Sequence, residues 1–313
     1  MKRVHVVVGL LIAVAILGMS LLTETSPQAT KRIEPLDLST FAQTPPPKLL
    51  RLLFIHHSCG GQWLASPGPD QGTNCICETN PNGGGLRLLL GRNNYSVHEA
   101  SYGSKIGHNT DIFDWLPKFS QQMSDILACD SQDNVHSNGI SNDIVAFKSC
   151  FPNNNFKSMG SSPGNPAGPE LTVWNAKATY VNLLKVFEKY PRVLFVAVTA
   201  PPLAPSRQPA WKKVAKRVLR REDGDLRTGR LAREFNNWLS SEDGWLKDYP
   251  LRNVLVFDYY NILTDDSQSD LSRYATAGGF DSHPSREGNG KAAAAFVPWL
   301  NRAVRRAGLV ELL

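Results

Sequence analysis

Beyond its first twenty-odd residues, the sequence has no apolar run of membrane-spanning length and no internal repeat. A helix needs about 20 consecutive apolar residues to cross a bilayer, and repeat architectures show a fixed sequence period. The sequence therefore predicts a soluble body that is neither a multi-span membrane protein nor a repeat array. Its 313 residues, of which 42% are hydrophobic, suffice for a sizeable core in one large domain or two small ones.

A strong excess of charge of one sign is also lacking. There are 34 Lys and Arg residues against 28 Asp and Glu residues, a formal net charge of +6. Removal of Lys2 and Arg3 with a leader would leave about +4, a mild excess that does not by itself indicate a nucleic-acid partner. Much of the excess lies between residues 207 and 233, where basic and apolar residues recur at helical spacing. This favours a solvated helix face, with contact to an acidic glycan or an anionic membrane surface as the alternative.

Cysteine is scarce. The sequence holds five cysteines: Cys59, Cys75, Cys77, Cys129 and Cys150. In an exported chain they would allow up to two disulfides and one free thiol, with a pairing that the sequence does not reveal. Cys75 and Cys77 are separated by one residue and no matching Cys or His pair follows, which argues against a zinc site there. The sequence predicts no metal site and no cofactor.

The N-terminus has the pattern of a leader. Lys2 and Arg3 precede an almost unbroken apolar run over residues 4–22, which is typical of an export signal or an N-terminal membrane anchor over residues 1–24. No small-x-small cleavage site stands out, so both options remain open, and no cysteine follows closely enough for lipid modification. The expected location is periplasmic, extracellular or membrane-anchored.

The segment after the leader, residues 25–47, is rich in Thr and Pro and ends in three prolines. This composition predicts a linker, and the folded domain is expected over residues 48–313. Within that domain short apolar runs predict strands over residues 49–56, 95–101, 143–149, 192–199 and 253–259. Helical spacing predicts helices over residues 85–90, 172–189, 210–239 with a break near Gly224, and 288–307.

This alternation of strands and helices predicts an α/β fold. Most of the strands are continuously apolar, as expected for strands buried on both faces of a parallel sheet. With right-handed crossovers the fold is a three-layer α/β/α sandwich with a central, mostly parallel five-stranded sheet. In such sheets ligands bind outside the carboxyl ends of the strands, so the residues after each strand are the candidates for a functional site.

The first candidate is Ser58, in the sequence HHSCGGQW over residues 56–63. It follows the first strand, and the glycines behind it allow the backbone to turn tightly. A serine at such a place would be exposed at the ligand-binding edge of the sheet. Taken alone, it could equally be a helix N-cap.

The loops after the second and third strands offer hydrogen-bond donors. Gly103 and Gly107 could each aim a backbone N–H group into a site. Asn153, Asn154 and Asn155 could supply a side-chain amide, although asparagines are also ordinary turn residues.

After the fifth strand, Asp281 and His283 precede an alanine-rich helix. A serine needs a neutral imidazole as base, and a carboxylate that fixes the tautomer of that imidazole. An Asp and a His in one loop can supply both. A zinc site made of His56, His57, Asp281 and His283 is the alternative, but adjacent residues of a strand point to opposite faces.

These four blocks, in this order over roughly residues 49–306, resemble the SGNH (GDSL-like) hydrolase superfamily, of which the chain would be a divergent, exported member. The resemblance implies a flavodoxin-like fold, Ser58 as nucleophile, His283 as base and Asp281 as its partner. It further implies an oxyanion hole made of the N–H groups of Ser58 and of Gly103 or Gly107, and the amide of Asn153.

The blocks depart from the family pattern in three places. The first reads HSCG in place of Gly-Asp-Ser, the third has Ser149 and Cys150 where Gly-x-Asn-Asp is expected, and the last is Asp-x-His in place of Asp-x-x-His. The strand order of the family also implies that Cys59 and Cys150 could form a disulfide. It leaves open which of Asn153, Asn154 and Asn155 completes the site.

The activity expected from this resemblance is that of a serine esterase, which forms an acyl-enzyme on Ser58. Export, mild basicity and the polar loop over residues 153–169 favour an acyl or acetyl group on a carbohydrate as the substrate. An acyltransferase with the same triad, and a noncatalytic glycan-binding domain of the same fold, are the alternatives.

Overall fold

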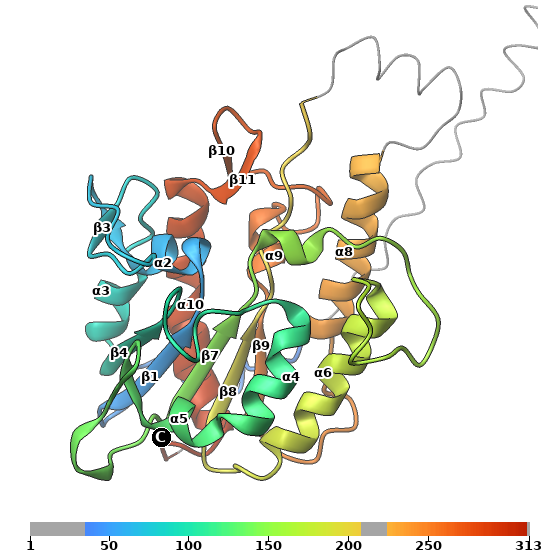
Figure 1. The fold of residues 1–313 in the computed structure, drawn as a ribbon. Coiled ribbons are helices and arrows are strands. Elements are labelled where there is room, and N and C mark those ends of the chain that lie inside the picture. Colours follow the sequence, from blue (N-terminus) through green and yellow to red (C-terminus); the bar gives the residue numbers. More distant parts are fainter. Residues whose placement is uncertain (1–34, 208–223, 312–313) are drawn as a thin grey trace, which may run out of the picture. The chain divides into compact units, whose positions relative to one another are not determined.

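The computed structural model describes residues 35–207 and 224–311, and its centre is a seven-stranded sheet (Figure 1). The five longest strands are β1 (Leu50–Ile55), β4 (Tyr95–Ala100), β7 (Ile144–Lys148), β8 (Leu194–Val198) and β9 (Val254–Phe257). All five were predicted from the sequence, and they pair in parallel in the order β4-β1-β7-β8-β9. This order, with the first strand between the second and the third, is that of flavodoxin-like sheets.

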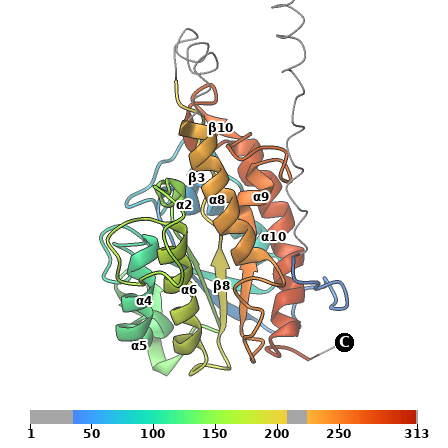
Figure 2. The same ribbon diagram turned by 90° about the vertical axis from the view of Figure 1, so that its right-hand side faces the viewer.

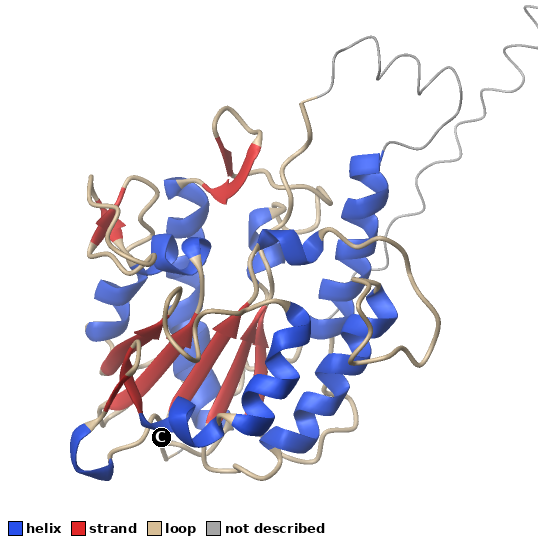
Figure 3. Cartoon of the chain, viewed as in Figure 1, coloured by secondary structure: helices blue, strands red, loops and turns tan. Residues whose placement is uncertain are grey.

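The sequence did not predict the two strands at the edge of the sheet beside β4. They are β5 (Cys129–Ser131), parallel to β4, and β6 (Asn134–Val135), antiparallel to β5. Two further strand pairs lie outside the main sheet: β2 (Ser66–Pro67) with β3 (Thr79–Asn80), and β10 (Ala275–Thr276) with β11 (Asp281–Pro284) (Figure 3). Strands of two to four residues carry too little periodicity to be recognised in a sequence.

Helices cover both faces of the sheet, so the expected three-layer α/β/α sandwich is confirmed (Figure 2). One layer contains α2 (Ser58–Leu64), α3 (Leu86–Gly91), α9 (Tyr259–Leu263) and α10 (Arg286–Arg306). The other contains α4 (Ile112–Gln121), α5 (Met123–Ala128), α6 (Val173–Phe187) and α8 (Gly224–Ser240), with the 3-10 turn η2 (Phe151–Asn154) beside α8. A second 3-10 turn, η1 (Ser137–Gly139), follows β6.

The strands read as continuously apolar because each face of the sheet has its own core. In β1, the side chains of Leu52 and Phe54 pack under α3 and α10, whereas those of Leu53 and Ile55 pack under α4 and α6. Successive side chains of a strand point to opposite faces, so a strand covered on both sides needs apolar residues at nearly every position.

Four helices were predicted at or near their places. The structure has α3, α6 and α10 where the spacing predicts them, and α8 forms the described part of the helix expected over residues 210–239. Residues 208–223, which carry much of the basic stretch, lie outside the described residues, as does the apolar leader. No helix among the described residues is long and apolar enough to cross a membrane.

The folded body begins earlier than the sequence predicts. The segment 35–47, expected to be part of a linker, packs against the layer of α10, with Leu36, Leu38 and Phe41 in the hydrophobic core on that face. Asn301 donates a hydrogen bond to the Gln43 carbonyl at 2.7 Å. The Thr- and Pro-rich composition does not reveal these few apolar contacts, and the described residues from 35 onward belong to one compact unit.

Candidate active site

The candidate residues gather where the sequence analysis places them, at the carboxyl edge of the sheet. Ser58 follows β1, the loop 101–108 follows β4, and Ser149 and Cys150 begin the segment after β7. Asp281 and His283 lie on β11, beyond β9 and α9. Segments far apart in the sequence therefore converge because parallel strands all end at this edge.

Ser58 is the first residue of α2, three residues beyond the end of β1. The turn is tight enough to require glycine behind it. A Cβ atom at Gly61 would lie 1.8 Å from the Cys75 carbonyl oxygen, and one at Gly60 would lie 2.4 Å from the Cβ of His56. Gly60 lets the helix start directly under the strand end, which holds Ser58 at the edge, whereas Gly61 permits the close approach of the loop at Cys75.

Three side chains form a hydrogen-bonded chain. The Ser58 Oγ atom lies 3.0 Å from Nε2 of His283, and Nδ1 of His283 lies 2.8 Å from Oδ1 of Asp281. A carboxylate can only accept, so the imidazole donates from Nδ1 to Asp281 and offers the lone pair of Nε2 to the hydroxyl. This is the arrangement of a nucleophile, a base and an orienting acid.

Asp281 is held by more than the imidazole. Its Oδ1 atom also accepts from the His283 backbone N–H at 3.2 Å, and its Oδ2 atom accepts from the Thr276 hydroxyl at 3.1 Å across the β10–β11 hairpin. Partial burial raises the pKa of Asp281, but these hydrogen bonds outweigh it, and the pKa is lowered overall. The short Asp-x-His spacing is therefore compatible with a carboxylate that stays ionised beside the imidazole.

The His57 side chain supports the loop after β4. Its ring stacks on Tyr102 with centroids 3.6 Å apart, and its Nε2 atom donates to the carbonyls of Gly107 and His108, each at 2.9 Å. Burial lowers the pKa of His57, which favours the neutral ring. From the sequence, His57 is a candidate only as a metal ligand. Nothing in the sequence indicates that it supports the loop after β4.

The two glycines of that loop differ in the state of their N–H groups. The Gly107 N–H donates to Ser104 Oγ at 2.9 Å and is thereby occupied. The Gly103 N–H makes no hydrogen bond within residues 35–207 and 224–311, and its φ of +83° is one that glycine adopts without strain. Of the two glycines, Gly103 is therefore the one whose backbone N–H group is available to an oxyanion.

The asparagines after β7 face elsewhere. Asn153 donates to an Asp111 carboxylate oxygen at 2.7 Å and accepts from the Ile112 N–H at 2.8 Å, so its amide caps the start of α4. Asn154 donates to the carbonyls of Ala200 and Pro201, and Asn155 is exposed. Both polar atoms of the Asn153 amide thus hold loops together, and only the second hydrogen of its NH2 group is left for the oxyanion-binding role expected of it.

Two thiols lie directly beside the serine. The Sγ atoms of Cys59 and Cys150 are 3.3 Å apart, and that of Cys150 is 3.8 Å from Ser58 Oγ. The neighbouring positions follow from the pairing of β1 with β7, but the disulfide expected between them is not formed, and all five cysteines are free. The hydrogen bond from the Cys59 thiol and the charge of the buried Lys148 lower the pKa of Cys150 despite its burial.

A hydrogen-bonded network of His56, Glu99 and Arg87 lies next to the residues that precede Ser58. The fully buried His56 lies 2.9 Å from a Glu99 carboxylate oxygen through Nε2, and Arg87 pairs with the other oxygen. Burial opposes the ionisation of Glu99, but these partners lower its pKa overall. Because His56 begins the two-residue link between β1 and α2, this network fixes the backbone that leads to Ser58.

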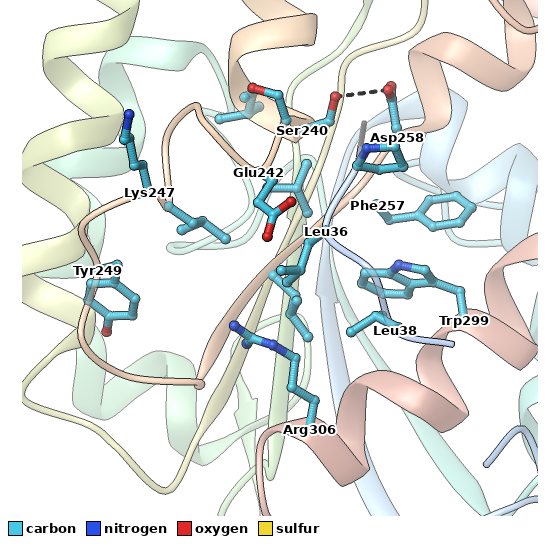
Figure 4. A pocket seen from close by; sticks show the side chains of 16 residues that line it. Leu36, Leu38, Ser240, Glu242, Lys247, Tyr249, Phe257, Asp258, Trp299 and Arg306 are labelled. Atoms are coloured by element: carbon cyan, nitrogen blue, oxygen red, sulfur yellow. Dashed lines mark hydrogen bonds between the residues drawn. The ribbon is translucent and has the colours of Figure 1, made fainter. Parts of the chain in front are cut away.

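A cavity of about 400 Å³ lies away from these residues, between α8, β9 and α10 (Figure 4). Leu36 and Leu38 of the N-terminal segment line it together with Trp299 and Phe257. Ser240 and the partly buried Asp258, which share a hydrogen bond at 3.0 Å, also line it. None of Ser58, Asp281 and His283 borders it, so it has no part in the chemistry considered below.

No family model matches the sequence, and no curated protein matches it. Among solved structures, the chain is similar to a carbohydrate esterase family 2 enzyme with a carbohydrate-binding domain from Corynascus thermopiles (Myceliophthora fergusii), at 16% identity and a TM-score of 0.37, over 83% of this chain and 67% of that one. It is also similar to a catalytic mutant of an acetylxylan esterase from Geobacillus stearothermophilus, at 12% identity and a TM-score of 0.38, over 85% of this chain and 97% of that one. Because these scores lie below 0.5, we base the functional proposal on this chain's own geometry.

Proposed function

We propose that this protein is a serine hydrolase that cleaves carboxylic esters. The observation that carries the proposal is the chain of hydrogen bonds from Ser58 through His283 to Asp281, at 3.0 Å and 2.8 Å, on the carboxyl edge of a parallel sheet. A serine hydroxyl becomes a useful nucleophile only when a base removes its proton, and this arrangement supplies that base in the required tautomer.

The reaction takes place in two steps. Ser58 Oγ attacks the acyl carbonyl while its proton passes to Nε2 of His283, and the same proton is then given to the departing alcohol. The product of the first step is an acyl-enzyme on Ser58. Water attacks that ester with His283 again as base, which releases the acid and restores the hydroxyl.

The oxyanion is held by the backbone N–H groups of Ser58 and Gly103. Gly103 is preferred to Gly107 because its N–H group is not already donated. The amide of Asn153 is left out because its hydrogen bonds with Asp111 and Ile112 hold it at the start of α4. Each well-placed donor of this kind contributes about 2.7–4 kcal/mol of transition-state stabilisation.

The substrate is an acylated or acetylated carbohydrate. The triad is open to solvent, with 45% of the Asp281 side chain exposed, so that a bulky alcohol can approach. Tyr102 and Phe280 are exposed aromatic side chains, 37% and 46% respectively, on the loops that follow β4 and precede β11. Such rings offer apolar faces for the C–H surfaces of a sugar. Export through residues 1–24 is part of the proposal and rests on the sequence alone.

Acetate release from p-nitrophenyl acetate and from acetylated xylo- and chito-oligosaccharides tests this function. We expect turnover by the wild type and its loss in Ser58→Ala, because the nucleophile is removed. Ser141→Ala is the matched control, since Ser141 is exposed and lies before β7 at the opposite edge of the sheet.

The same assay separates hydrolysis from acyl transfer. Acetate that appears without any added sugar acceptor supports the esterase. Product that forms only when a deacetylated acceptor is present would identify an acyltransferase instead. Turnover that Ser58→Ala does not change would contradict both.

A further inference from the structure

A cluster of two histidines and one aspartate lies at the edge of the sheet beside β4. His98 is in β4, Asp130 is in β5, and His136 follows β6. One ligand atom from each residue lies within 4.8 Å of the other two. The triad proposed for ester hydrolysis shares no residue with this cluster.

We propose that His98, Asp130 and His136 form a binding site for a divalent transition-metal ion of the zinc type. Nδ1 of His98 and Nδ1 of His136 lie 2.7 Å and 3.6 Å from the same atom, Oδ1 of Asp130. Bond lengths of about 2.0–2.2 Å place tetrahedral zinc ligands about 3.4 Å apart, so small side-chain adjustments accommodate the ion. Two imidazoles and one carboxylate are donors that zinc accepts readily, with water in the fourth position.

The outer contacts of His136 point its lone pair into the cluster. Its Nε2 atom lies 3.2 Å from Oδ1 of the buried Asn142. The orientation of the Asn142 amide is fixed, because its Nδ2 atom faces the carbonyls of Ile126, Leu127 and Cys129. Oδ1 of Asn142 can only accept, so a neutral His136 ring carries its proton on Nε2 and turns an unshared pair on Nδ1 toward the Asp130 carboxylate. Two acceptors that face each other at 3.6 Å leave room for a cation between them.

His98 also has an outer hydrogen-bond partner. Nε2 of His98 lies 3.0 Å from the Ser96 hydroxyl, which can accept a proton from the ring when Nδ1 binds a metal. The imidazole keeps its single proton, which moves from Nδ1 to Nε2. Metal-binding histidines usually have such an outer partner, and it fixes their tautomer. Nearly half of the Asp130 side chain is exposed, whereas the His98 and His136 side chains are 14% and 8% exposed, so an ion can reach the carboxylate and two largely covered imidazoles.

Such an ion would fasten the β5–β6 hairpin to the main sheet, where only one pair of residues joins β5 to β4. The hairpin in turn supports the loop that carries Gly103. Gln132 accepts from the Ser101 N–H at 2.8 Å and donates to the Tyr102 carbonyl at 2.9 Å, and Asp133 accepts from the Lys105 N–H at 2.7 Å. The metal is therefore expected to stabilise an edge of the sheet that contacts the active-site loop.

Binding of Zn²⁺ and Co²⁺ to purified protein from which metal has been stripped by a chelator tests the proposal. We expect one equivalent of Zn²⁺ to bind and to raise the melting temperature by about 5 °C. Bound Co²⁺ should show the visible bands of a four-coordinate ion without the near-ultraviolet band of thiolate ligands. His136→Ala and Asp130→Asn should both abolish these signals, whereas His108→Ala, which removes an exposed histidine outside the cluster, should keep them.

Asp130→Asn distinguishes a lost metal ligand from misfolding, because the amide preserves the shape of a half-exposed side chain. Circular dichroism checks that each variant is folded. Three outcomes would overturn the proposal: no binding of Zn²⁺ at micromolar concentration, binding that survives both substitutions, or a thiolate band that assigns the ion to Cys75 and Cys77. None of these outcomes depends on ester hydrolysis.

Discussion

Replacement of His283 by alanine is expected to lower kcat for ester hydrolysis by about 10³-fold or more. Nε2 of His283 is the atom that lies 3.0 Å from Ser58 Oγ, so the substitution removes the acceptor for the hydroxyl proton. Without it the serine must attack as a neutral hydroxyl, which is a poor nucleophile. The measurement is the steady-state rate on p-nitrophenyl acetate.

The fold should survive this change, because His283 is only partly buried and its main packing contact is the ring of Phe151 at 5.0 Å. His108→Ala is the matched control, since the side chain of His108 is exposed and its backbone, which His57 uses, is unchanged. A rate within a factor of about three of the wild type for His283→Ala, outside the scatter of the control, would exclude the imidazole as base.

The substitution Asp281→Asn is expected to lower kcat by up to about 10⁴-fold. The carboxylate accepts the Nδ1 proton of His283 and stabilises the positive charge that the ring acquires during attack. An amide in its place carries no charge and can donate to Nδ1, which would hold the ring in the wrong tautomer. KM should change much less than kcat, because Asp281 acts through His283 and not on the substrate.

Asp243→Asn provides the comparison, since Asp243 is an exposed residue that pairs with Lys247 after α8. If Asp281→Asn retained most of its activity while His283→Ala lost it, His283 would remain the base. The assignment of Asp281 as its partner would then be wrong. That outcome is a specific risk of the Asp-x-His spacing, in which the acid lies one residue nearer than the family pattern expects.

The sequence predicts the sheet well because the sheet is buried on both faces. β8 and β9 read as continuous apolar runs, a pattern that depends only on burial. Helices were harder to predict. α4 carries Pro117 in its interior, which argues against a helix, but there the structure packs Trp115 and Phe119 into the core. Tertiary packing of this kind cannot be seen in a local pattern.

The parts of the site that were predicted are those whose chemistry is local. Asp281 and His283 stand two residues apart in one loop, and Ser58 stands at the end of a recognisable strand. The partners of Asn153 and His57 could not be predicted, because they come from the loops at 107–112 that only the fold brings near. The cluster of His98, Asp130 and His136 was missed for the same reason, since no familiar spacing joins the three.

The most direct test of the account is the reaction of the purified protein with a fluorophosphonate that labels activated serines. We predict one labelled site, located at Ser58 by mass spectrometry of the digested protein, with no labelling of Ser58→Ala and strongly reduced labelling of His283→Ala. Failure of the folded wild-type protein to react, or a label on another serine, would contradict the central claim that Ser58 is the nucleophile.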